Sequence, residues 1–149
     1  MAKKDHKSSL PASEHIYWGA DVPMRVIRRF ARVVAERFSP DRIILFGSHA
    51  YGSPHADSDV DILVVMPAHN RHSQAVKIRW EVPAPFPMDL LVRTPQEMTR
   101  GLAEGDTFLT EIISKGEVLY ENGDARVGKE GRGRLPRRQK PRPKQTSRP

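Results

Sequence analysis

The chain has 149 residues, no cysteine and a formal net charge of +7. This length suits one domain with a real core, and the missing cysteines exclude disulfide bridges and thiolate metal sites. No apolar run approaches the roughly 20 residues that a membrane-spanning helix needs, and the start of the chain has no hydrophobic stretch, so we expect a cytoplasmic protein without a membrane partner.

The positive charge is confined to the C-terminal end. Residues 121–149 hold ten Lys and Arg against three Asp and Glu, whereas residues 1–120 hold fifteen of each kind. Because the end is poor in apolar residues and rich in proline, residues 123–149 are predicted to be a disordered basic tail. Nucleic-acid or acidic-partner binding by this tail and a purely solubilising role are equal alternatives. Residues 1–20 are predicted to be a flexible segment, and residues 21–122 the folded domain.

The first element of the folded domain is an amphipathic helix. Apolar residues recur at three- and four-residue intervals from Asp21 to Phe38, and Asp21 is placed to cap the helix, with Pro23 close to its first turn. The Pro40 region then breaks the helical pattern before a buried strand at 43–46.

The remaining predicted elements are three strands and three helices. Strands are predicted at 59–65, 88–92 and 118–120, and helices at 71–80, after Thr94 and after Asp106. Thr94 followed by Pro95 and Glu97 is a signature of a helix start. Trp80 and Phe86 are expected in the core. The order of elements indicates a compact α/β domain.

Two carboxylates interrupt the strand at 59–65. Since side chains alternate across a strand, Asp59 and Asp61 should share one face while Val60, Ile62 and Val64 share the other. Unpaired like charges on a sheet are costly, so a cation is expected beside them, and carboxylate oxygens suit Mg²⁺ or Mn²⁺. Asp89 adds a third carboxylate from another apolar strand.

Gly47 and Ser48 stand where the strand at 43–46 ends. Glycine allows close approach to a ligand, and a following helical turn would offer N–H groups and the Ser48 hydroxyl to a phosphate. Together with the three aspartates, this arrangement favours two-metal nucleotidyl transfer. Asp57 and Ser58 are interpreted as turn and strand-entry residues, with the alternative that Ser58 orients Asp59.

The stretch "GSHAYGSPHADSDVDILVV", followed by "PMDLLV", resembles the minimal (MNT-type) nucleotidyltransferase domains of the DNA polymerase β-like superfamily. The resemblance covers about residues 23–121 and includes the ending "SKGEVLYE", which is similar to the family's "REGRVLYE". It implies an α/β (α+β) fold with a small mixed sheet flanked by helices. The chain departs from the family in having His49 where Arg is frequent, which makes a phosphate contact there weaker or pH-dependent.

The resemblance also implies roles for the site residues. Asp59 and Asp61 would hold Mg²⁺ (or Mn²⁺) and the nucleoside triphosphate, Asp89 would bind the metal that activates the acceptor hydroxyl, and Gly47 and Ser48 would bind the β- and γ-phosphates. All three aspartates are thus candidate catalytic residues. A zinc site is disfavoured, because the histidines are spread over polar loops.

The implied activity is transfer of NMP, most simply AMP from ATP, to a hydroxyl. The resemblance points to an antitoxin-like protein that acts on a small helical HEPN-type partner. Two alternatives stay open: nucleotidyl transfer to RNA ends or a small molecule, and a non-catalytic module that binds nucleotide or partner.

Overall fold

The computed structural model describes residues 15–123. Most of the segment predicted to be flexible, residues 1–14, and the predicted basic tail from residue 124 onward lie outside the described residues. Within them, no helix is both long and apolar enough to cross a membrane.

Helices and strands alternate in the order that the sequence predicts. The helices are α1 (Met24–Phe38), α2 (Ser48–Tyr51), α3 (Arg71–Glu81), α4 (Pro95–Ala103) and α5 (Thr107–Lys115), preceded by the 3₁₀ turn η2 (Gly19–Asp21). The strands are β1 (Arg42–Phe46), β2 (Val60–Val65), β3 (Met88–Arg93) and β4 (Glu117–Glu121).

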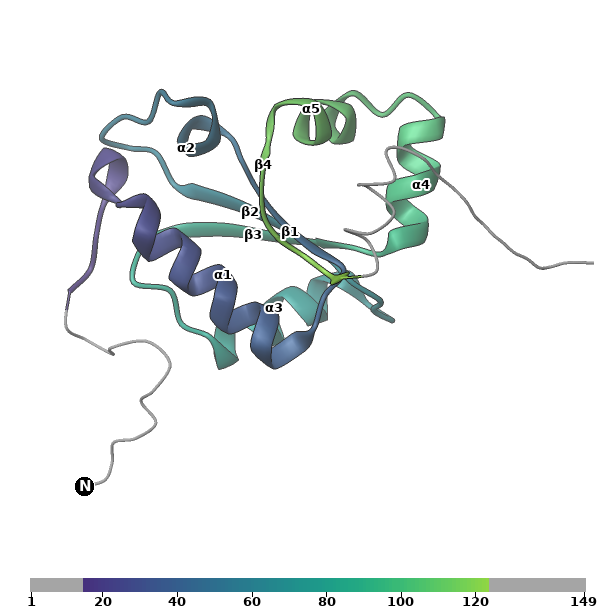
Figure 1. The fold of residues 1–149 in the computed structure, drawn as a ribbon, viewed down its shortest axis with the longest axis horizontal. Helices are drawn as coiled ribbons and strands as arrows, with labels where there is room; N and C mark the ends of the chain where they lie inside the picture. The colour runs from purple at the N-terminus through teal and green to yellow at the C-terminus, as the bar shows by residue number, and fades with distance from the viewer. Residues whose placement is uncertain (1–14, 124–149) are drawn as a thin grey trace, which may run out of the picture.

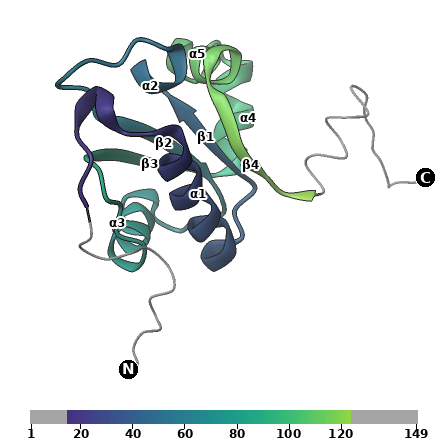
Figure 2. The same ribbon diagram turned by 60° about the vertical axis from the view of Figure 1, so that its left-hand side comes forward.

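The four strands form one mixed sheet in the order β3-β2-β1-β4. Strand β1 is antiparallel to both β2 and β4, whereas β2 and β3 are parallel and are connected by α3. Helices α1 and α3 cover one face of the sheet, and α4 and α5 lie on the other (Figures 1 and 2). The predicted mixed sheet flanked by helices is therefore confirmed.

Both faces of the sheet are buried, which explains the long apolar runs in its strands. On the α1/α3 face, Val60, Ile62 and Val64 pack in the larger core. On the α4/α5 face, Leu63 and Val65 pack in a smaller second core. Strand β2 thus alternates as predicted, and the face that carries Asp61 continues into the second core.

Helix α1 begins later than predicted, because Pro23 occupies its N-cap position. The expected cap by Asp21 is wrong: this residue closes the turn η2, and α1 has no side-chain cap. A residue before proline is biased toward extended backbone, and Val22 is indeed extended, so the helix cannot reach back to Asp21.

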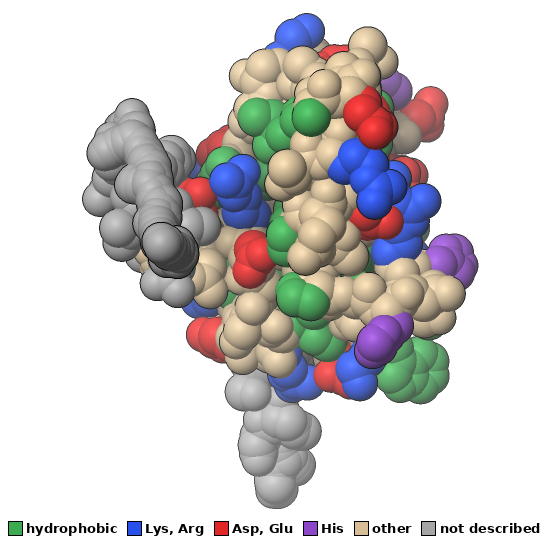
Figure 3. All heavy atoms as spheres, turned by 90° about the vertical axis from the view of Figure 1, so that its right-hand side faces the viewer, with side chains coloured by type: hydrophobic (Ala, Val, Ile, Leu, Met, Phe, Trp, Pro, Cys, Tyr) green, Lys and Arg blue, Asp and Glu red, His purple; other side chains and the backbone are tan. Residues whose placement is uncertain are grey.

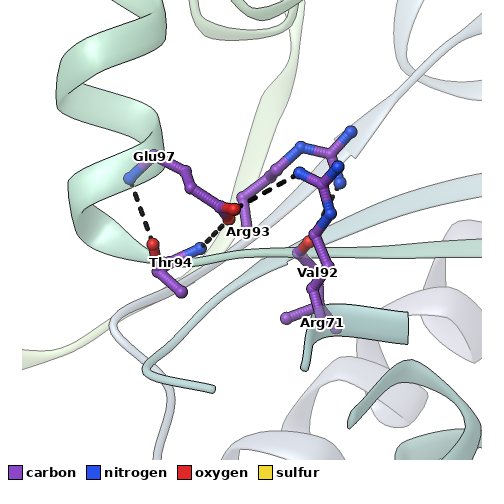
Figure 4. A network of polar contacts seen from close by, with 5 residues as sticks. All are labelled: Arg71, Val92, Arg93, Thr94 and Glu97. Atoms are coloured by element: carbon purple, nitrogen blue, oxygen red, sulfur yellow. Dashed lines mark hydrogen bonds and ion pairs between the residues drawn. The ribbon is translucent and has the colours of Figure 1, made fainter. Parts of the chain in front are cut away.

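The helix start at Thr94 is confirmed and belongs to a larger polar network (Figure 4). The Thr94 hydroxyl accepts from the Glu97 N–H at 3.1 Å, and the Glu97 carboxylate accepts from the Thr94 N–H at 2.9 Å. Glu97 also pairs with Arg71 at 3.4 Å. Arg93 lies near Arg71, and its pKa is lowered first by burial and then by that neighbouring charge. The network joins the starts of α3 and α4 to the end of β3.

Trp80 is on the surface, contrary to the prediction that it belongs to the core. Its exposed fraction is 84 %, whereas Phe86, also predicted in the core, is 5 % exposed. On α3 the buried residues are Ala75 and Ile78. Since each helical residue turns about 100°, Trp80 points nearly opposite to Ile78.

Residues 15–22, called here the N-terminal strap, make defined contacts with two loops. The Tyr17 N–H donates to the Pro85 carbonyl at 2.9 Å, in the loop before β3. Gly19 has a φ of +52°, and a Cβ at this position would lie 2.2 Å from the Ala56 carbonyl oxygen, in the loop before β2. The strap therefore supports both loops that lead into strands with carboxylates (Figure 2).

Candidate active site

Strand register brings the predicted site residues to one end of the sheet. Asp61 lies opposite Phe46 of β1 on one side and opposite Asp89 of β3 on the other. Directly paired residues on neighbouring strands present their side chains to the same face, so Asp61 and Asp89 share the α4/α5 face. Gly47 follows Phe46 in the chain and thus lies beside Asp61.

Gly47 is in direct contact with Asp61. Its φ is +74°, and a Cβ added to it would lie 2.1 Å from Asp61 Oδ2. Only a residue without a side chain allows the carboxylate to come so close to the backbone. The sequence predicts close approach of a ligand at this glycine, and the structure adds that the glycine also accommodates a carboxylate of the site.

The short helix α2 follows Gly47, as the sequence predicts. The Gly47 carbonyl accepts from the N–H groups of Ala50 and Tyr51, both at 3.0 Å. The first N–H groups of a helix have no acceptor within it and are oriented toward its start, where they suit an anion. The helix ends at Gly52, whose φ is +85°.

Ser58, predicted to be a strand-entry residue with the alternative that it orients Asp59, lies in the site. It is 6 % exposed, and its hydroxyl oxygen lies 3.0 Å from that of Ser48. The same oxygen accepts from the His55 N–H at 2.9 Å. A serine directly before the first carboxylate is the only sequence signal for this role. Ser58 thus connects the Gly47-Ser48 turn to the segment that enters β2.

The three carboxylates interact electrostatically. Burial, the Asp89 charge and the Asp59 charge, in this order, raise the pKa of Asp61 from 3.8 to about 6. Asp59 and Asp89 are exposed, whereas Asp61 is half-buried between them. The protein therefore holds an uncompensated negative charge at Asp61 in neutral solution.

A pH dependence of stability follows from this pKa. The pKa of folded Asp61 lies above its unfolded value, so between about pH 4 and pH 6 the folded state binds more protons than the unfolded state. In metal-free solution, the melting temperature of the wild type relative to Asp61→Asn should rise as the pH falls from 7 to 4. A difference that stays constant over this range, measured by thermal denaturation, would show that Asp61 has an ordinary pKa.

The carboxylate oxygens of Asp59, Asp61 and Asp89 are the kind of ligand that a hard divalent cation prefers. Oxygen ligands suit Mg²⁺ and Mn²⁺. A cation would favour the charged form of Asp61, whose pKa is raised by burial and then by the charges of Asp89 and Asp59. Within residues 15–123, no three His, Cys, Asp or Glu side chains form a group that could hold a metal ion as they stand, either at these aspartates or at the histidines. Mg²⁺ usually keeps several waters and shares substrate oxygens, so two carboxylates for each ion would suffice. The metal roles of Asp59, Asp61 and Asp89 stay predictions.

His49 lies inside the site in the place where the family often has Arg. Burial lowers its pKa, and the backbone of Gly19 opposes this effect to a smaller extent. Its Nε2 atom is buried and has no hydrogen-bond partner within the described part of the chain. At neutral pH the imidazole is uncharged, so it offers little electrostatic attraction to a phosphate.

Charges on the face of the molecule at the α4 end are mixed. On the face at the α4 end, Lys and Arg alternate with Asp and Glu, and no large patch of one sign is visible (Figure 3). This agrees with the equal numbers of acidic and basic residues in positions 1–120. That face therefore offers no continuous basic track for a polynucleotide.

Comparisons with known proteins identify a protein family that matches this chain. The profile of the family described as "Nucleotidyltransferase domain" matches residues 27–117. No curated protein matches the chain. A solved structure assigned as a nucleotidyltransferase from Sulfolobus solfataricus is 21% identical, with a TM-score of 0.41 over 52% of this chain and 71% of the other. A toxin–antitoxin structure with AMP-PNP is 22% identical, and a mutant of the toxin–antitoxin MntA-HpeT is 20% identical, each with a TM-score of 0.42 over 67% of this chain and 78% of the other.

Proposed function

Since the chain belongs to the nucleotidyltransferase domain family, we propose that it transfers AMP from ATP, with Mg²⁺, to a hydroxyl group of a helical HEPN-type protein partner. The observation that carries the proposal is the Asp61 carboxylate beside the Gly47-Ser48 turn. Its pKa is raised to about 6, first by burial and then by the charges of Asp89 and Asp59. Perturbed carboxylates next to a phosphate-binding turn are typical of catalytic sites.

Each group has a separate task in this proposal. Asp59 and Asp61 would hold Mg²⁺ and through it the triphosphate, and Asp89 would bind the metal that activates the acceptor hydroxyl. Bound Mg²⁺ would lower the pKa of that hydroxyl and offset charge in the transition state. Gly47 and Ser48 orient the β- and γ-phosphates for departure as pyrophosphate. The pKa of Asp61 of about 6 still leaves most of it ionised at pH 7.

A protein acceptor is favoured over a polynucleotide. Positions 1–120 have no excess of basic residues, and a polynucleotide acceptor would need a basic groove. A docked protein supplies its own orientation and can place one hydroxyl in line with the α-phosphate. The ending "SKGEVLYE", similar to that of small stand-alone members, supports the antitoxin-like role.

The test uses ATP labelled in the α-phosphate, Mg²⁺ and, as the acceptor, a small helical HEPN-type protein whose gene neighbours the gene of this chain. Label should appear on a Tyr, Ser or Thr of that protein with the wild type, and should be absent with Asp61→Asn. The matched control Asp57→Asn changes an exposed acid of the turn before β2 and should keep the activity. Label on RNA or on a small molecule instead would show that the acceptor belongs to that class. An unmodified partner whose activity both wild type and Asp61→Asn suppress would establish a binding module.

A further inference from the structure

Ser58 makes hydrogen bonds that restrict where protons can lie. Its hydroxyl oxygen accepts from the His55 N–H at 2.9 Å, and its own N–H donates to the His55 carbonyl at 3.0 Å. The Ser48 hydroxyl, 3.0 Å away, is the other partner of the Ser58 hydroxyl within residues 15–123. These hydrogen bonds hold the side chain of Ser58 in place, and the residue is only 6 % exposed.

A hydroxyl group has one proton, so the pair of serines has two arrangements. If Ser48 donates to Ser58, the proton of the buried Ser58 has no acceptor among the described residues, and Ser48 has no proton left for a ligand. If Ser58 donates to Ser48, the buried proton is satisfied and the Ser48 proton is free to point outward. The second arrangement satisfies more groups.

We propose that Ser58 is a positioning residue that directs the Ser48 proton to a phosphate oxygen of the bound nucleotide. The chain of donors runs from the His55 N–H to the Ser58 hydroxyl, then to the Ser48 hydroxyl and to the phosphate. A phosphate oxygen only accepts hydrogen bonds, so its arrival selects this direction, and successive bonds strengthen one another. The inference rests on the proposed function in taking a nucleoside triphosphate as the ligand.

The position of Ser58 gives this arrangement a second consequence. Ser58 directly precedes Asp59, so one residue fixes both the turn that holds phosphate and the start of the strand that holds the carboxylates. Phosphate binding and the placement of Asp59 should therefore depend on the same hydroxyl pair.

A double-mutant cycle tests the proposal. Calorimetry would measure binding of α,β-methylene-ATP with Mg²⁺, because this analogue cannot transfer AMP, to wild type, Ser48→Ala, Ser58→Ala and the double variant. Each single variant should bind about tenfold more weakly, the loss expected for a hydrogen bond to a charged group. The double variant should bind no more weakly than Ser48→Ala alone, because Ser58 acts through Ser48.

Two controls separate positioning from loss of structure. Binding of AMP, which lacks the β- and γ-phosphates, should be the same for Ser58→Ala and the wild type. Ser53→Ala, which changes an exposed serine of the same loop, should bind the analogue normally.

Three results would overturn the proposal. Additive losses in the double variant would mean that Ser58 acts independently of Ser48. An equal loss of AMP binding would mean that Ser58 only supports the loop. Unchanged binding by Ser58→Ala would mean that it has no role. If the wild type itself binds no nucleotide, then the proposed function is wrong. This result differs from the other three, which all require that the wild type binds.

Discussion

Asp61→Asn should lower the rate of AMP transfer by on the order of a hundred- to a thousandfold. The substitution keeps the size of the side chain and its contact with Gly47, but an amide cannot supply the anionic oxygen that the proposed Mg²⁺ site requires. Asp59→Asn and Asp89→Asn should show losses of similar size, because in the proposed mechanism the three carboxylates bind the same ions. Labelled-phosphate transfer under single-turnover conditions measures the effect.

The same substitution should stabilise the metal-free protein. Because the pKa of Asp61 is raised to about 6, ionisation of this group opposes folding at neutral pH. The carboxylate is partly exposed and solvent screens its interactions, so the gain should be about 1 kcal/mol rather than the full value of the shift. Asp57→Asn, with the same chemical change on the exposed turn, should have almost no effect. An Asp61→Asn variant that is inactive but less stable than the wild type would indicate a structural role for this carboxylate.

Gly47→Ala should inactivate the protein with a smaller effect on stability. The new Cβ would lie 2.1 Å from Asp61 Oδ2, so the carboxylate must rotate away from the site. A φ of +74° with a ψ of −162° lies in a region essentially confined to glycine, so a side chain there adds strain of about 1–3 kcal/mol. We expect loss of transfer comparable to that of Asp61→Asn, together with a melting temperature a few degrees lower.

Gly52→Ala is the matched control, since it stands at the other end of α2 with a φ of +85° and no atom within 4 Å of an added Cβ. Its ψ of 16° places it in the left-handed region, so alanine adds strain there too, although less than at Gly47, and the variant should keep its activity. The comparison therefore tests whether strain at one end of α2 stops the reaction without a contact with Asp61. If both alanine variants lose activity equally, then the conformation of α2 matters and the contact does not.

Local signals predicted the elements of the fold well. Thr94 and Glu97 are close in the chain, and the capping box that they form depends on little else. The strands could be predicted because both faces of the sheet are buried, which gives long apolar runs with the carboxylates as exceptions. The Gly47-Ser48 turn and the following helix could be predicted from the glycine and its position after a strand.

Features that depend on tertiary neighbours could not be predicted in this way. Trp80 is apolar, but its exposure depends on which side of α3 meets the sheet. The contact of Gly47 with Asp61 depends on the register of β1 with β2. Ser58 is a common turn residue by type, and its burial depends on Ser48, ten positions earlier in the chain. In each case the feature depends on a part of the chain that comes close only after folding.

The N-terminal strap has a consequence for where the minimal domain begins. The family match starts at residue 27, whereas the strap holds the loops before β2 and β3 through Gly19 against Ala56 and Tyr17 against Pro85. A protein trimmed to the matched region would keep the three aspartates of the candidate site and the Gly47-Ser48 turn. It would nevertheless lose the strap contacts to the loops before β2 and β3, which position those aspartates. The folded unit of this protein therefore extends beyond the residues that the family matches.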